Sequence, residues 1–194
     1  MSSKWILSAT EIETFNICRR KWGYRYLDLL IPSSTPAMEL GRAVHKILEN
    51  YLKTSEINNQ GIEGKIATAG LHFLPKNLLG DKVEKCFLYK LDDHIFHGFM
   101  DFYDQVGPQT WLVGDHKTCS TFATALTSDE LKTNVQANIY AQWFFQEKNA
   151  DTVQLRWIYY RTKSKPDAKV VEANLCKEEV NQNFKSILDT VGEI

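Results

Sequence analysis

The sequence lacks several features by which whole classes of protein are recognised. Its 194 residues include only four cysteines and five prolines, and the formal net charge is -1. No apolar run approaches the roughly 18 residues that a membrane-spanning helix needs. No apolar signal-peptide core follows the first methionine either. We therefore expect a cytoplasmic protein with no membrane partner, with a phage origin as one alternative.

The four cysteines are too far apart to form a familiar metal site. Structural zinc and iron–sulfur sites normally contain at least one closely spaced pair. Here the residues are scattered along the chain as Cys18, Cys86, Cys119 and Cys176. In a reducing compartment such cysteines act as small apolar side chains. We expect all four to be reduced and buried.

The remaining composition is that of a globular protein, 43% hydrophobic and 12% aromatic, without a repeat or a linker. We predict one domain over residues 1–194, with a helical part at about 8–75 and a part of strands and helices at about 80–194. One sizeable core fits this length. A basic cluster near the N-terminus contains Arg19, Arg20 and Lys21. It is usual for such a cluster to be a solvated helix face, although it would also suit contacts with phosphates.

The spacing of apolar residues changes from helical to strand-like near residue 83. Before it we predict helices starting at Ser8 and covering 38–52 and 62–73. After it we predict strands at 83–89, 95–104 and 110–117, one long helix at 128–148, strands at 152–161 and 169–175, and a helix at 177–191. Ser8 with Glu11, and Thr127 with Glu130, have the spacing of a capping box. This order predicts an α/β fold, a central mixed sheet with a mainly antiparallel meander flanked by helices.

A carboxylate and a lysine stand two residues apart in the third predicted strand. Because side chains alternate along a strand, Asp115 and Lys117 share a face and His116 points to the other one. An Asp-x-Lys sequence is by itself usually an exposed ion pair. Here the apolar run Trp111–Gly114 leads directly into the acid, which favours burial, and buried acids need partners.

A second acid lies in the preceding predicted strand. Asp101 is expected on the face of Phe99 and Tyr103. If the hairpin pairs Asp101 with Asp115, their side chains come within about 5 Å. A slip of one residue would place them on opposite faces, so the register decides whether the two acids meet.

Two carboxylates this close repel each other unless a cation lies between them. Oxygen ligands suit Mg²⁺ or Mn²⁺. Such an ion would polarise a phosphodiester and make a bound water more acidic. Lys117 would orient that water and stabilise the developing charge. This combination favours phosphodiester hydrolysis.

Five motifs along the chain resemble, in their order, the RecB-type branch of the PD-(D/E)xK nuclease superfamily. They are the Ser8–Tyr24 pattern with Phe-x-x-Cys-x-x-Lys, Gly41-x-x-x-His45, Gly98-x-x-Asp101, Asp115-His116-Lys117 and Gln136-x-x-x-Tyr140. Each motif alone is common, whereas five in sequence are fairly specific. The resemblance implies a restriction-endonuclease-like core and a DNA nuclease.

The resemblance also implies roles for individual residues. His45, Asp101 and Asp115 would be side-chain ligands of Mg²⁺ or Mn²⁺, the backbone carbonyl of His116 would add a ligand, and Lys117 would be catalytic. A histidine at the border of an apolar stripe is by itself more often structural. As a ligand, His45 would shift the preference toward Mn²⁺.

Other residues are candidates for supporting roles. Gln136 and Tyr140 lie four residues apart and so share a helix face, from which they would hold the lysine or the DNA strand. Glu84 is a candidate for a further acid near the metal, or an exposed strand residue. The cluster of Arg19, Arg20 and Lys21 is a candidate for phosphate contacts.

Some RecB-type relatives, including CRISPR adaptation nucleases, bind a [4Fe–4S] cluster through one early and three late cysteines. Cys18 matches the early position and only Cys176 stands late, so we expect no cluster. The leading hypothesis is a DNA exonuclease acting on duplex ends or single strands, in recombination, repair or phage DNA metabolism. The alternatives are a catalytically inactive DNA-binding or scaffold domain, and a CRISPR adaptation nuclease without a cluster. Protein partners are not predicted.

Overall fold

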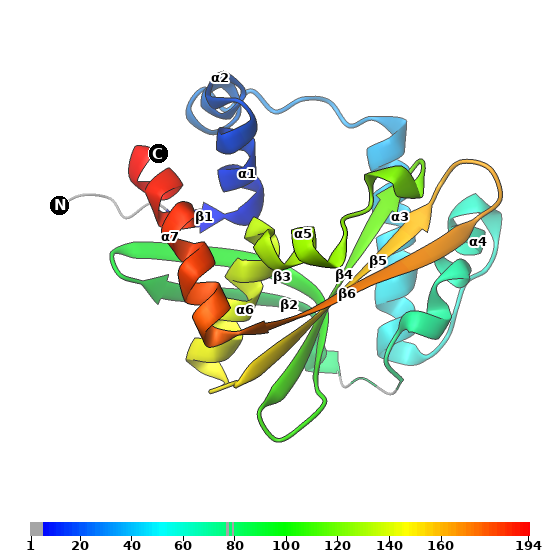
Figure 1. Ribbon diagram of the computed structural model, residues 1–194. Helices are drawn as coiled ribbons and strands as arrows, with labels where there is room; N and C mark the ends of the chain where they lie inside the picture. The colour runs from blue at the N-terminus through cyan, green and yellow to red at the C-terminus, as the bar shows by residue number, and fades with distance from the viewer. Residues whose placement is uncertain (1–5, 77, 79) are drawn as a thin grey trace.

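The protein is described by a computed structural model that covers residues 6–76, 78 and 80–194. Six strands form one twisted sheet with helices on both faces (Figure 1). The strands are β1 (Ile6–Ser8), β2 (Val83–Leu91), β3 (His94–Gln105), β4 (Thr110–Cys119), β5 (Thr152–Arg161) and β6 (Asp167–Cys176). Their order is β1-β3-β4-β5-β6, with β2 also paired to β3. The β1–β3 and β4–β5 pairs are parallel and the others antiparallel, so the predicted mixed sheet is confirmed.

Helices cover the sheet in two groups. The helices are α1 (Ala9–Ile17), α2 (Arg19–Trp22), α3 (Pro36–Thr54), α4 (Gly61–Ala69), α5 (Ser128–Thr133), α6 (Val135–Glu147) and α7 (Lys177–Glu193). A π-helical turn, Gly23–Leu27, extends α2, and 3-10 turns lie at Leu71–Phe73, Gly80–Lys82 and Phe122–Thr124. Helices α3 and α4 bury one apolar core with Phe102, and α1, α6 and α7 bury a second core with Phe96. None of the described helices is long and apolar enough to span a membrane.

Most predicted elements are present, but the extent of one predicted helix is wrong. The helix expected over 128–148 is two helices, because Asn134 leaves the helical conformation at φ -64° and ψ 134°. The Asn134 side chain accepts a hydrogen bond from the Ala137 N–H at 3.0 Å and so starts α6. Thr127 and Glu130 form the predicted capping box of α5, and Ser8 caps α1 by accepting from the Glu11 N–H at 3.2 Å.

The cysteines differ from the prediction of burial. All four are free, but Cys18 and Cys86 are exposed, and Cys119 and Cys176 are only partly buried. Cys18 lies between two helices, where its Sγ accepts from the Lys21 N–H at 3.5 Å.

Strand β3 pairs with different strands along its two edges, and one edge is left unpaired near the candidate site. One edge pairs with β2 from His94 to Phe102. The other edge pairs with β1 over Ile95–His97 and with β4 from Phe102 onward. Residues 98–101 therefore lie between two partner strands on that edge, where their backbone groups pair with neither β1 nor β4.

Candidate functional site

Strands β3 and β4 separate at the two predicted acids. Their last ladder pair is Phe102 with Gly114, so Asp101 and Asp115 follow next in the same register. This is the register on which the predicted site depends. Asp101 Oδ2 accepts a hydrogen bond from the His116 N–H at 2.6 Å, so a carboxylate binds the backbone where the ladder ends. Gly114 is required here because a Cβ would lie 1.8 Å from the Phe102 ring.

The alternation of β3 changes at the same place. Phe99 is exposed, whereas Tyr103 is buried against Phe144, so the predicted common face for Phe99 and Tyr103 is wrong. Opposite Asp101, Glu84 of β2 has a left-handed backbone with φ 53°. Strands β2 and β3 twist sharply at Glu84, and a strict two-residue alternation of side chains does not predict such a twist. Asp101 consequently lies at the point where the alternation of β3 side chains between the two faces of the sheet is interrupted.

Asp115 and Lys117 contact each other on one face, as predicted, with 2.8 Å between Nζ and Oδ2. Gln136 of α6 joins them: its Nε2 donates to Asp115 Oδ1 at 2.7 Å, and its Oε1 accepts from Lys117 Nζ at 2.7 Å. The same Nε2 donates to the Tyr140 hydroxyl at 2.7 Å, and that hydroxyl donates to the Phe99 carbonyl. Both Gln136 donors and its acceptor are thus used, which holds the amide in one orientation.

His45 of α3 and Glu84 of β2 lie near Asp101. His45 Nδ1 of α3 lies 3.6 Å from Asp101 Oδ2. One turn earlier, a Cβ on Gly41 would stand 2.9 Å from Thr118 Oγ1, so glycine allows α3 to approach β4. A cavity of about 370 Å³ lies here, and the residues that line it include Gly41, His45, Glu49, Glu84, Asp101 and Thr118. The predicted Glu84 therefore shares a pocket with Asp101.

Two acids near the site were missed by the sequence analysis. Glu49 of α3 lies one turn after His45, and its i+4 spacing was a signal that could have found it. Glu13 of α1 is half-buried near Lys117; burial raises its carboxyl pKa more than the lysine lowers it. Asn134 Nδ2 also donates to Glu13 at 3.4 Å. No sequence signal links Glu13 itself to the site, because only tertiary packing brings it near Lys117.

The two central acids differ electrostatically. Burial raises the pKa of the Asp115 carboxyl, and the Lys117 ammonium offsets this only in part. Burial acts in the same direction on Asp101, but the His45 contact and the His116 backbone hydrogen bond outweigh it, so the Asp101 pKa is lowered. Burial disfavours the Lys117 ammonium, yet Asp115 more than compensates and raises the Lys117 pKa. Asp115 and Lys117 lie at ion-pair distance, with 2.8 Å between Oδ2 and Nζ.

The His116 ring lies on the opposite face from Asp115, as predicted. It is buried between His45, Phe102 and Tyr160, with ring centroids 5.4 to 5.6 Å apart. Burial lowers the pKa of this imidazole to about 4. A neutral ring packed in this way fills the core, and the predicted ligand at this position is the backbone carbonyl, not the ring.

The basic cluster lies apart from the carboxylates. Arg19, Arg20 and Lys21 are exposed on α2, the helix at the top of Figure 1. Arg19 pairs with Glu193, and Arg20 Nε donates to the Tyr24 hydroxyl at 2.8 Å. The structure does not bring this cluster into the pocket of Asp101.

The donor set suits a divalent ion by chemistry, but it is not arranged as a ligand sphere. The carboxylates of Asp101 and Asp115 and the imidazole of His45 are donors for Mg²⁺ or Mn²⁺. Within residues 6–76, 78 and 80–194, however, no three His, Cys, Asp or Glu side chains converge closely enough to hold an ion. Asp101 contacts His45 and a backbone N–H, and Asp115 contacts Lys117 and Gln136. An entering ion would have to replace some of these contacts.

Comparison with known proteins agrees with this fold. Residues 6–71 match the family model of the PD-(D/E)XK nuclease superfamily, a range that includes His45 but neither Asp101 nor Asp115. A candidate exonuclease from Eubacterium rectale has a TM-score of 0.63 at 12% identity over 94% of this chain and 77% of its own. The protein SSO0001 has a TM-score of 0.53 at 15% identity over 100% of this chain and 79% of its own. No curated protein matches. At such low identities, the likeness to these two structures concerns the fold alone. Together with the family match, it confirms the predicted restriction-endonuclease-like core.

Proposed function

We propose that the chain is a divalent-metal-dependent deoxyribonuclease of the PD-(D/E)XK nuclease superfamily, whose family model matches residues 6–71. One observation carries the proposal. At the point where β3 and β4 separate, the buried Asp115 carboxylate holds Lys117 and Gln136 beside a second buried acid, Asp101. Two acids and a lysine in this arrangement suit the cleavage of a phosphodiester.

Each side chain has a proposed part. Asp101, Asp115, His45 and the His116 carbonyl would hold Mg²⁺ or Mn²⁺, which lowers the pKa of bound water and neutralises charge on the phosphate. Lys117 Nζ donates a hydrogen bond to Gln136 Oε1 and forms an ion pair with Asp115 Oδ2. An ammonium has three N–H donors, so Lys117 would also donate to the attacking water or a phosphate oxygen. The imidazole in the set favours Mn²⁺ over Mg²⁺.

We further propose an exonuclease that acts on duplex ends or single strands, in recombination, repair or phage DNA metabolism. The fold shared with the candidate exonuclease from Eubacterium rectale supports this mode. We propose no iron–sulfur cluster, because Cys18 has only Cys176 as a late companion. The RecB-type subgroup stays a prediction from the motifs.

A second candidate function is a DNA-binding or scaffold domain without activity. It is favoured by one observation, that among the described residues no three His, Cys, Asp or Glu side chains converge on a metal position. The same assay separates the two functions.

The test uses end-labelled single- and double-stranded DNA with Mg²⁺, Mn²⁺ or EDTA. We expect metal-dependent cleavage that Asp115→Asn or Lys117→Ala reduces by about 100-fold or more, as when one transition-state donor is removed. Asp104→Asn is the matched control, since it breaks another Asp–Lys ion pair, between β3 and the 3-10 turn Gly80–Lys82, with 2.6 Å between Lys82 Nζ and Asp104 Oδ1. A closed circle should resist an exonuclease that degrades the linear form.

Two results would contradict the proposal. Cleavage that survives both Asp115→Asn and Lys117→Ala would refute the assigned site. A folded wild-type protein that binds DNA but cleaves no substrate with any metal would favour the scaffold function instead.

A further inference from the structure

The β2–β3 hairpin continues beyond Asp101 as a sheet face that none of the described helices covers. Residues two apart on a strand share a face, and cross-strand pairing joins Cys86 to Phe99, Leu88 to His97 and Lys90 to Ile95. Strand β1 adds Ile6 beside Ile95. We name this surface the open hairpin face; it consists of Ile6, Cys86, Leu88, Lys90, Ile95, His97 and Phe99.

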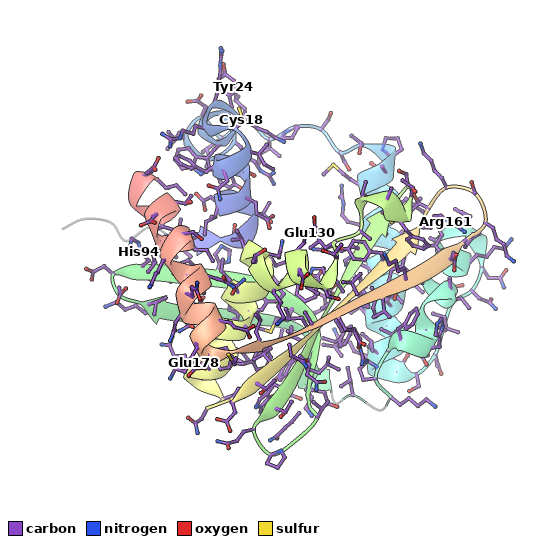
Figure 2. All side chains as sticks on the ribbon, viewed as in Figure 1. Cys18, Tyr24, His94, Glu130, Arg161 and Glu178 are labelled. Carbon is purple, nitrogen blue, oxygen red and sulfur yellow. The ribbon has the colours of Figure 1, made fainter. Side chains whose placement is uncertain are left out.

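The open hairpin face differs from the reverse side of the same strands. On the reverse side, Phe87, Phe96 and Met100 are buried in the core with α6 and α7. On the open face, Leu88 is 59% exposed and Phe99 57% exposed. Helix α3 covers the sheet only farther along, and it lies across the molecule from the hairpin tip that His94 marks in Figure 2. The face is therefore available to a ligand that also reaches Asp101.

Phe99 is the part of this face nearest to the proposed chemistry. It precedes Asp101 by two residues, about 7 Å along the strand. Its carbonyl accepts from the Tyr140 hydroxyl, which is bonded through Gln136 to Asp115. The backbone that carries the ring is thus tied to the site.

Gly98 helps to keep the Phe99 ring exposed on the open hairpin face. A Cβ at Gly98 would lie 2.8 Å from the Phe87 ring, so glycine lets the strand pack directly on Phe87. The close packing holds the strand against the core on one side while Phe99 projects from the other.

We propose that the open hairpin face binds the DNA strand that flanks the scissile phosphate, and that Phe99 stacks on a nucleobase of that strand. This inference rests on the proposed function. Aromatic side chains stack on bases of any sequence, which suits an enzyme without base readout. Lys90 and His97 interrupt the apolar side chains, so the face resembles a stacking platform more than the continuous apolar patch of a protein interface. Lys90 adds positive charge for the phosphates.

The test is a binding titration with a fluorescent, single-stranded phosphorothioate oligonucleotide, which resists cleavage, in Mg²⁺. One stacked base contributes about 1–3 kcal/mol, so Phe99→Ala should raise Kd about 5- to 150-fold. Phe99→Trp should stay within about threefold of the wild type, because it keeps a ring. Leu88→Ala is the matched control: it has similar exposure on the same face but no ring, and its Kd should change less than about twofold.

A second arm locates the stacked base. An abasic residue is moved stepwise along the oligonucleotide; at one position it should weaken binding by the wild type and have no effect on Phe99→Ala. Wild-type Kd for Phe99→Ala, or equal losses for Leu88→Ala and Phe99→Ala, would overturn the inference, as would a self-association that Phe99→Ala abolishes. Absence of wild-type binding would also overturn it. Cleavage of unmodified DNA, measured separately, decides the proposed function, so the two failures are distinguishable.

Discussion

Two buried tyrosines of the same core predict opposite outcomes for the same substitution. Tyr140 and Tyr89 are 3% and 2% exposed. The Tyr140 hydroxyl accepts from Gln136 and donates to the Phe99 carbonyl. The Tyr89 hydroxyl is buried and has no hydrogen-bond partner among the described residues. Replacing each by phenylalanine removes one oxygen and leaves the ring in place, so the difference between the variants reports the hydrogen bonds.

The expected magnitude follows from these contacts. Tyr140→Phe leaves the Phe99 carbonyl without its donor, which costs about 1–3 kcal/mol of unfolding free energy. In a chain of this size, 1 kcal/mol corresponds to about 2–4 °C in Tm, so Tm should fall by about 2–12 °C. Tyr89→Phe removes a hydroxyl whose desolvation is not compensated. Its Tm should be unchanged or higher.

The measurement is thermal unfolding by circular dichroism, repeated in urea to check that the m-value is unchanged. Neither variant needs an active enzyme, so this result is independent of the proposed function. Equal Tm values for the two variants would refute the reasoning, and so would a larger loss for Tyr89→Phe than for Tyr140→Phe.

The remaining predictions concern the backbone around the site. Gly114→Ala should lower the unfolding free energy by at least about 1–3 kcal/mol, since the new Cβ would meet the buried Phe102 ring; a Tm equal to the wild type would show that Phe102 can move away. Asn134→Ala should cost about 1 kcal/mol through loss of the α6 cap, measured by urea unfolding. A stabilised Asn134→Ala variant would instead indicate that α5 and α6 fuse into the single helix that periodicity predicts.

Local patterns were sufficient for most elements and for part of the site. Alternation placed Asp115 and Lys117 on one face, and their 2.8 Å contact agrees with it. The i, i+4 spacing placed Gln136 and Tyr140 on one helix face, and they share a hydrogen bond. These successes depend on interactions between residues close in sequence, for which the period of a strand or helix determines the geometry.

Each prediction that failed has an identifiable cause in the backbone conformation or in contacts between residues far apart in the sequence. The helix over 128–148 breaks because the Asn134 side chain competes for a backbone N–H. The common face predicted for Phe99 and Tyr103 fails because β2 and β3 rotate around Glu84, whose φ is 53°. Strand β1 was missed because three residues are too few for a periodic signal.

The sequence alone determined the order of the elements and the residue types of the site, because apolar periodicity, caps and the Asp-x-Lys spacing are local properties. Only the tertiary structure decided which distant groups meet Asp101 and Asp115. It brings His45 from α3, Gln136 from α6 and the backbone N–H of His116 to the gap between β3 and β4. It also leaves the Phe99 ring exposed beside them. These contacts depend on how helices pack across a twisted sheet, and that packing energy is summed over the whole chain.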